Sequence, residues 1–195
     1  MHRSTLYALL DRYEARYPQD PTAGRIRAFA REHRDCLERS CRLGHITAGA
    51  WILDPCEERA LLTHHRKLDR WLQLGGHVDG ESDILRAAIR EAREESGIEA
   101  FEVWVDRAGR GAWGAPEDGD AVVLDLDIHP IPARGAEPEH DHLDVRFLFR
   151  ARSARLTISD ESNDLRWFTS AEVASATDEE SVLRLLHRAA ALMGR

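Results

Sequence analysis

The chain has 195 residues, of which 43% are hydrophobic and 32% are charged, and its formal net charge is −8 at pH 7. This length supports one domain with a full hydrophobic core, and the negative charge argues against broad nucleic-acid binding, which needs a basic surface. The sequence predicts no membrane span, because no apolar run approaches about 18 residues, and no secretory export, because no charged-then-apolar leader opens it.

The first predicted unit is a helical extension over residues 1–43. Apolar side chains recur at helical spacing over 6–13, and the proline-containing segment 17–21 then breaks the pattern. A second helix is predicted from residue 22 to about 42, because apolar side chains again fall on one side. We expect the extension to pack on the following domain or on a partner subunit.

Two strands are predicted next. The hydrophobic period changes to two over 46–53, and a second short apolar run covers 60–63. The polar segment 64–70 is interpreted as a surface connection. These elements lead into a glycine pair, Gly75 and Gly76, which marks a turn.

A short helix with a cluster of carboxylates follows the glycine turn. The segment from about 83 to 96 carries an apolar stripe at helical spacing, with Ser82 or Asp83 as its N-cap and Gly97 as its C-terminal stop. The glutamates at positions i, i+3 and i+4 share one face of this helix. They are Glu91, Glu94 and Glu95.

The position of these glutamates is unfavourable unless something neutralises them. Like charges repel at this spacing, and the helix dipole is negative near its C-terminus. A local preference that is broken in this way tends to mark a functional site. Hard cations such as Mg²⁺ take carboxylate oxygens as ligands, so the cluster indicates a metal site.

The remaining elements complete an α+β fold. The sequence predicts strands over 101–105, 122–129, 143–150 and 165–168, loops over 109–119 and 130–141, a brief helix capped by Ser170, and a terminal helix over about 178–192. The strands over 122–129 and 143–150 are predicted to pair antiparallel across their loop. This order favours a mixed β-sheet with helices on its faces.

Polar side chains alternate with apolar ones along this antiparallel pair. They are Asp125, Asp127 and His129 on the first strand, and His140, His142, Asp144 and Arg146 on and before the second. Three interpretations stay open: the stripe lines a substrate cleft, it faces solvent, or a transition metal binds its imidazoles and a carboxylate. The third would use His140, His142 and Asp144, and would favour Zn²⁺ or Mn²⁺.

The segment from residue 76 to 98 resembles the Nudix box, G-x5-E-x7-R-E-U-x-E-E-x-G-U, where U is apolar. The matching residues are Gly76, Arg90, Glu91, Ala92, Glu94, Glu95, Gly97 and Ile98. Ser82 stands where the first glutamate of the box is expected, and Glu81 lies one residue early. On this resemblance the chain is similar to the MutT-like Nudix hydrolases, with no subgroup identified.

The resemblance implies a Nudix-type α/β/α sandwich with a mixed sheet over 44–195, preceded by the extension 1–43. It implies a Mg²⁺-dependent pyrophosphohydrolase, with Mn²⁺ as an alternative ion. The expected substrate is a nucleoside diphosphate linked to X or a related small-molecule diphosphate, and the family also allows a homodimer. The metal ligands would be Glu91, Glu94 and Glu95.

Further site residues follow from the same resemblance. The expected catalytic carboxylates are Glu91, Glu94 and Glu161, the last with Asp160 and Asp164 as alternatives in the loop before Trp167. The expected substrate-binding residues are Gly75, Gly76 and His77 at the glycine pair, and the cleft interpretation of the polar stripe adds His142 and Asp144. Arg90, Gly97 and Glu81 are expected to be structural, with Glu81 replacing the first glutamate of the box.

Two other functions of the fold stay open. One is a sensor that binds a nucleotide without cleaving it, and the other is an enzyme similar to isopentenyl diphosphate isomerase, which uses a catalytic cysteine. The cysteines are Cys36, Cys41 and Cys56, and an odd number without a CxxC pair is typical of reduced thiols. We therefore expect a cytoplasmic protein. The sequence does not select one diphosphate.

Overall fold

A mixed nine-stranded sheet lies between two layers of helices in the part of the chain that the structure, a computed structural model, describes: residues 3–107, 109–118, 120–135, 137–159 and 162–195. The strands are β1 (Gly44–Leu53), β2 (Arg59–His65), β3 (Arg70–Leu72), β4 (Leu74–His77), β5 (Phe101–Arg107), β6 (Arg110–Gly114), β7 (Val123–Ile131), β8 (His140–Ala151) and β9 (Ser162–Thr169). The helices are α1 (Ser4–Arg16), α2 (Thr22–Glu32), α3 (Ile84–Ser96), α4 (Ser170–Ala176) and α5 (Glu180–Leu192).

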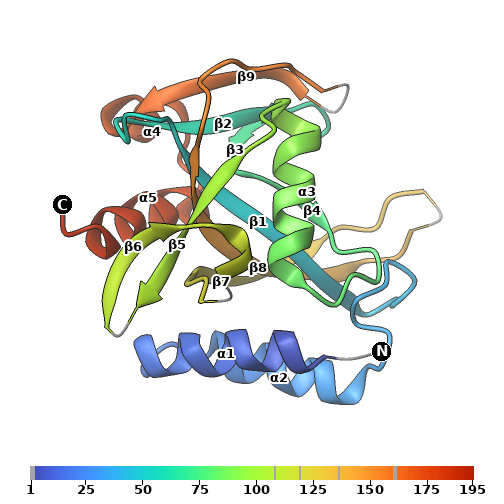
Figure 1. The fold of residues 1–195 in the computed structure, drawn as a ribbon. Coiled ribbons are helices and arrows are strands. Elements are labelled where there is room, and N and C mark those ends of the chain that lie inside the picture. The colour runs from blue at the N-terminus through green and yellow to red at the C-terminus, as the bar shows by residue number, and fades with distance from the viewer. Residues whose placement is uncertain (1–2, 108, 119, 136, 160–161) are drawn as a thin grey trace.

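Strand β1 is the centre of the sheet, and all ten of its residues are buried. It pairs parallel with β8 and antiparallel with β2 and β4. Even-numbered side chains such as Ala48 and Ile52 pack in a core shared with α3 and the N-terminal helices. Trp51 and Leu53 pack in a second core with α4 and α5, so helices cover both faces (Figure 1). The predicted α+β sandwich is therefore confirmed.

The box helix forms where the sequence predicts it. The Asp83 carboxylate accepts the Arg86 N–H at 3.2 Å as the N-cap, and Gly97 ends the helix at a φ of 69°. The apolar side of α3 packs against β1 and β4. These caps fix which turns of the helix carry the glutamates.

Replacing Gly97 with alanine is expected to lower the free energy of unfolding by about 1–3 kcal/mol, because alanine is strained at positive φ. The added Cβ would also lie 2.6 Å from the Thr157 Cβ. Urea denaturation measures the change. Gly24→Ala is the matched control, because the space beside Gly24 is open to 4.0 Å; equal midpoints for the two variants would contradict the prediction.

The second helix is shorter than predicted. It ends at Glu32 rather than near residue 42, because His33 takes an extended conformation with φ −112° and ψ 105°. Beyond it, the Cys36 carbonyl accepts the Ile46 N–H at 2.7 Å and the Leu37 carbonyl accepts the Gly80 N–H at 2.8 Å. A helix would have kept these carbonyls for itself, so contacts with distant segments override the helical pattern.

Two predicted loops contain strand. The segment 64–70, predicted as a surface connection, includes the end of β2, where His64 lies opposite Trp71 of β3. The segment 109–119 contains β6, which pairs with β5. Its glycines hid the alternation, and Gly111 is needed because a Cβ there would lie 2.6 Å from the Trp104 indole nitrogen.

The N-terminal helices share the core of the sheet. Leu6, Leu10 and Ile26 are fully buried in the same apolar cluster as β1 and β8. At the other end of the chain, Arg188 of α5 donates to the Asp20 carboxylate at 2.9 Å and also contacts the Tyr13 hydroxyl. The first and last helices are thus tied together.

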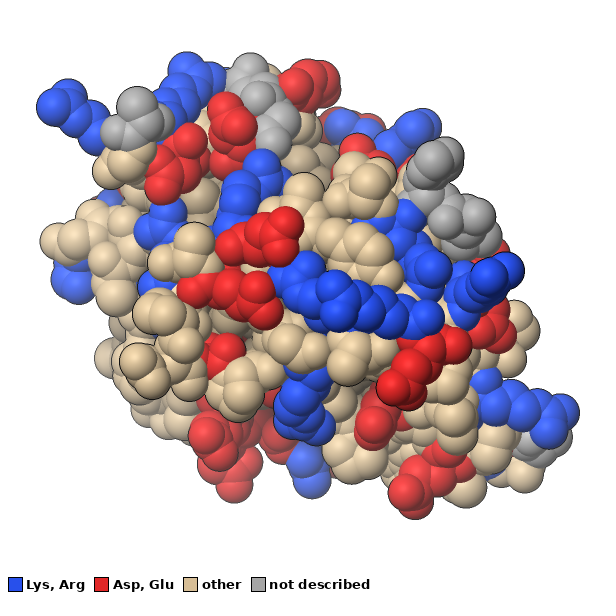
Figure 2. Space-filling model, turned by 90° about the horizontal axis from the view of Figure 1, so that it is seen from below, with Lys and Arg blue, Asp and Glu red and all other residues tan. Residues whose placement is uncertain are grey.

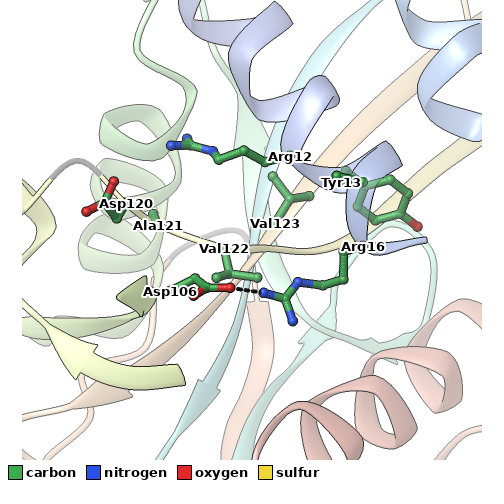
Figure 3. A pocket seen from close by; sticks show the side chains of 9 residues that line it. Arg12, Tyr13, Arg16, Asp106, Asp120, Ala121, Val122 and Val123 are labelled. Carbon is green, nitrogen blue, oxygen red and sulfur yellow. Dashed lines mark hydrogen bonds and ion pairs between the residues drawn. The ribbon is translucent and has the colours of Figure 1, made fainter. Parts of the chain in front are cut away.

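A hollow and a face of mixed charge lie at the surface around these helices. A cavity of about 420 Å³ lies beside α1 and the ends of β5 and β7, where Arg16 pairs with Asp106 at 2.6 Å (Figure 3). The face that contains α1 and α2 shows basic and acidic side chains interspersed (Figure 2). Among the described helices, none is long and apolar enough to cross a membrane.

Candidate functional site

Gly75 and Gly76 do not form the predicted turn, because both lie inside strand β4, opposite Gly49 and Ala48 of β1. The acidic face of α3 lies against this glycine pair. The Gly75 N–H donates to the Glu95 carboxylate at 3.2 Å. The Glu91 carboxylate lies directly over Gly76, since a Cβ at residue 76 would be 2.7 Å from its carboxyl carbon. Exposure increases outward along the face, with 14% of the Glu91 side chain and 60% of the Glu94 side chain accessible.

A side chain would fit at neither glycine of the pair, because the backbone of β1 approaches Gly75 and the Glu91 carboxylate approaches Gly76. Gly75 has a φ of 151°, and a Cβ on it would lie 2.6 Å from the Ala48 carbonyl oxygen. Because neither glycine has a side chain, the peptide groups of the glycine pair and the carboxylates of α3 form one polar surface. This all-oxygen donor set fits a hard divalent cation.

Arg90 connects helix α3 to strand β4. Its guanidinium donates to the His77 carbonyl at 2.7 Å, to Glu91 at 2.6 Å and to Glu94 at 3.3 Å. Burial raises the pKa of Glu91 above its ordinary value, and Arg90 only partly offsets this. The arginine therefore orients the carboxylates but leaves one of them incompletely compensated.

The shortened box loop has its own contacts. Glu81 accepts the Asp83 N–H at 2.9 Å and lies 3.8 Å from the Arg86 guanidinium. It thus lies just before the start of α3, nine positions before Arg90. Its expected structural role stays a prediction.

The remaining carboxylate candidates lie near the start of β9. Glu161 and Asp160 fall outside the described residues. Asp164 is in β9 and pairs with Arg166 at 2.8 Å. The expected contribution of this segment to catalysis stays a prediction.

The polar stripe of β7 and β8 is divided into two parts, and the first is a buried ion network. Arg146, which is fully buried, donates to Asp125 and Asp127 at 3.1 Å each and also to Asp144. Arg184 of α5 adds bonds to Asp125 at 3.0 Å and to Asp127 at 2.9 Å. Asp125 has 0% exposure, so the solvent-facing interpretation is wrong for it.

The pKa values of the network follow from these contacts. Burial acts to raise the pKa of Asp144, but Arg146 and His129 outweigh it and hold that pKa below its ordinary value. Burial also acts to raise the pKa of Asp127, but the His129 ring, 3.6 Å away, and the charge of Arg146 outweigh it and hold that pKa well below its usual range. Both carboxylates are therefore ionised and already paired.

The second part of the stripe is a group of histidines at the other end of these strands. His45 of β1 lies opposite His142 of β8, which lies opposite His129 of β7. The ring centroids of His45 and His77 are 4.9 Å apart, and those of His77 and His142 are 5.1 Å apart. The sequence interpretation missed His45, because only the parallel pairing of β1 with β8 brings it to His142.

The chain is similar to one family of known proteins. The family described as NUDIX domain matches residues 44–188. A Nudix-family hydrolase from Clostridium perfringens has a similar structure, with a TM-score of 0.57 and 22% identity over 76% of this chain and 96% of that chain.

Two further solved structures have the same fold. A MutT Nudix hydrolase from Burkholderia pseudomallei gives a TM-score of 0.52 and 20% identity over 74% of this chain and 97% of that chain. The E. coli dihydroneopterin triphosphate pyrophosphohydrolase gives 0.54 and 17% over 73% and 92%. No curated protein matches the chain.

Proposed function

The chain belongs to the Nudix family as a hydrolase of pyrophosphate bonds, and on this premise we propose that it is a Mg²⁺-dependent pyrophosphohydrolase of a nucleoside diphosphate linked to X or a related small diphosphate. The observation that supports this proposal is the contact of the α3 carboxylates with the glycine pair of β4, where Gly75 donates to Glu95 and Glu91 lies over Gly76. Mn²⁺ is the alternative ion.

The metal would be held by Glu91, Glu94 and Glu95, since they supply the carboxylate oxygens beside the glycine pair of β4. The bound ion supplies neutralisation of the diphosphate charge and acidification of a water. The N–H groups of Gly75 and Gly76 would approach the phosphates, because no side chain intervenes. Either Glu91 or Glu161 takes the proton of the attacking water. Arg90 holds Glu91 in position through its 2.6 Å bond.

The predicted substrate-binding residues His77, His142 and Asp144 are not part of this proposal, because their side chains lie on the face of the sheet opposite Glu91. His77 lies opposite Thr47 of β1, whereas Gly76, which faces Glu91, lies opposite Ala48. Asp144 already contacts Arg146 and the Thr47 hydroxyl, and His142 lies between the rings of His77 and His129.

Replacing Gly76 with alanine is expected to lower kcat/KM about 10²-fold, the loss that a 1 Å displacement of a reacting group causes. The added Cβ would lie 2.7 Å from the Glu91 carboxyl carbon and would push this carboxylate away from strand β4. Steady-state kinetics on the best substrate measures the change. Gly24→Ala is the control, and equal kcat/KM values for the two variants would remove Gly76 from the site.

The test of the function itself is phosphate release, coupled to a phosphatase, across a panel of nucleoside diphosphate derivatives at pH 7–9. Each reaction is run with Mg²⁺, Mn²⁺ or EDTA. Turnover of one class that EDTA abolishes is the expected result. Metal-dependent nucleotide binding without turnover would overturn the proposal and favour the sensor.

Three further properties are part of the proposal. The protein is cytoplasmic, in keeping with free thiols at Cys36, Cys41 and Cys56. Residues 1–43 are an extension of the domain 44–195, because their apolar side chains enter its core. The protein acts on a small molecule rather than nucleic acid, since Figure 2 shows mixed charge on the N-terminal face, and homodimerisation stays open to measurement.

A further inference from the structure

Five imidazoles from four neighbouring strands meet on one face of the sheet. They are His45 of β1, His77 of β4, His129 of β7, and His140 and His142 of β8. The His45 ring lies 5.0 Å from that of His140 and 4.9 Å from that of His142, measured between centroids. A packed group of this kind is unusual, because each neutral imidazole needs a partner for two nitrogens.

Three of these side chains present ligand atoms to a common point. One ring nitrogen each from His45, His140 and His142 lies within 4.8 Å of the other two. His45 is only 2% exposed, and neither of its ring nitrogens has a hydrogen-bond partner among the described residues. A buried nitrogen without a partner costs free energy, and a bound ion would remove that cost.

A backbone carbonyl lies behind one of the three rings. The Nδ1–H group of His140 donates to the Pro138 carbonyl at 2.9 Å, so the lone pair of this ring is on Nε2. A carbonyl bonded to the second ring nitrogen in this way orients metal-binding histidines in known metal sites.

The donor set also indicates which ions the site would take. Neutral imidazoles with nitrogen donors favour Zn²⁺ and similar ions over Mg²⁺. The nearby carboxylates of Asp127 and Asp144 already pair with Arg146, so they are poor competitors.

We propose that His45, His140 and His142 form a transition-metal site, with Zn²⁺ as its expected occupant. This site is separate from the carboxylates of α3. Gly76 lies opposite Ala48 and faces Glu91, whereas His77 lies opposite Thr47 and faces His45. The proposal therefore does not depend on the proposed hydrolase function.

The test is Zn²⁺ binding by the full-length protein, with any polyhistidine tag removed and bound metal stripped by a chelator. Competition with a chromophoric chelator is expected to show one tight equivalent, and X-ray absorption of the loaded protein is expected to show imidazole nitrogens at about 2.0–2.1 Å. His142→Gln and His140→Gln should each weaken binding at least about 100-fold, the most that loss of an orienting group alone costs.

Matched controls separate this site from the rest of the molecule. His187→Gln removes an exposed histidine of α5, and Glu94→Gln with Glu95→Gln removes the carboxylates of α3; both proteins should keep the tight equivalent. Circular dichroism of the metal-free variants shows whether each is folded. The proposal fails if the wild type binds no Zn²⁺, if folded His142→Gln and His140→Gln bind it normally, or if the carboxylate variant loses it.

Discussion

Glu94→Gln and Glu95→Gln are each expected to lower kcat at least about 10²-fold, the loss that removal of one charge-stabilising group causes. Glutamine keeps the shape of glutamate and removes its charge, so the metal would lose a ligand oxygen with full negative charge. Glu94 is 60% exposed on its side chain, and a glutamine at 95 can still accept the Gly75 N–H. We therefore expect unchanged folding.

The control for this experiment is Glu99→Gln, which removes an exposed carboxylate just beyond the end of α3. Its kcat should equal that of the wild type. Thermal unfolding should give the same midpoint for all the variants. Folded Glu94→Gln and Glu95→Gln proteins with full Mg²⁺-dependent turnover would show that the carboxylates of α3 are not the metal ligands.

Arg146→Met is expected to lower the free energy of unfolding by about 3–5 kcal/mol, because it leaves buried carboxylates without their shared cation. Asp125 and Asp144 have almost no exposure, so water cannot replace the guanidinium. For a chain of this size the midpoint of thermal unfolding should fall by roughly 6–20 °C. Arg86→Met is the control, since Arg86 is 79% exposed and should contribute at most about 1 kcal/mol.

The deficit of Arg146→Met should shrink as the pH falls from 7 to 4. In the wild type the pKa values of Asp127 and Asp144 are depressed, so their contribution is present above the unfolded pKa of about 3.9 and is lost as the pH falls through the folded values. Without the guanidinium these pKa values rise, and the carboxylates become neutral at higher pH. A constant difference between the two proteins from pH 7 to 4 would contradict this account.

Local signals explain which parts of the fold could be predicted. For α3, the cap at Asp83, the stop at Gly97 and the apolar stripe all agree, so the helix and its carboxylate face follow from sequence alone. The strand β6 was hidden because its glycines remove the alternation that marks a strand. The predicted second helix is too long, because the carbonyls of Cys36 and Leu37 accept hydrogen bonds from distant segments that the local pattern does not show.

The site divides in the same way. The spacing of Glu91, Glu94 and Glu95 is a local property, and it predicts that they share a face. The roles of His45 and Arg146 depend instead on strand pairing and on α5. Such pairing joins distant residues: Thr47 and Asp144, for example, are in contact although 97 positions separate them. A single sequence gives no register between distant strands, so the polar stripe could be seen but not divided into a network and a histidine group.

The contact between the first and last helices has a consequence for synthesis on the ribosome. Asp20 and its partner Arg188 are 168 positions apart, so Asp20 is translated long before the residue that it contacts. The helices α1 and α2 therefore emerge with apolar faces that have no surface to cover them until β1 and β8 follow. Their polar contacts with Arg188 are expected to form only after α5 has left the ribosome.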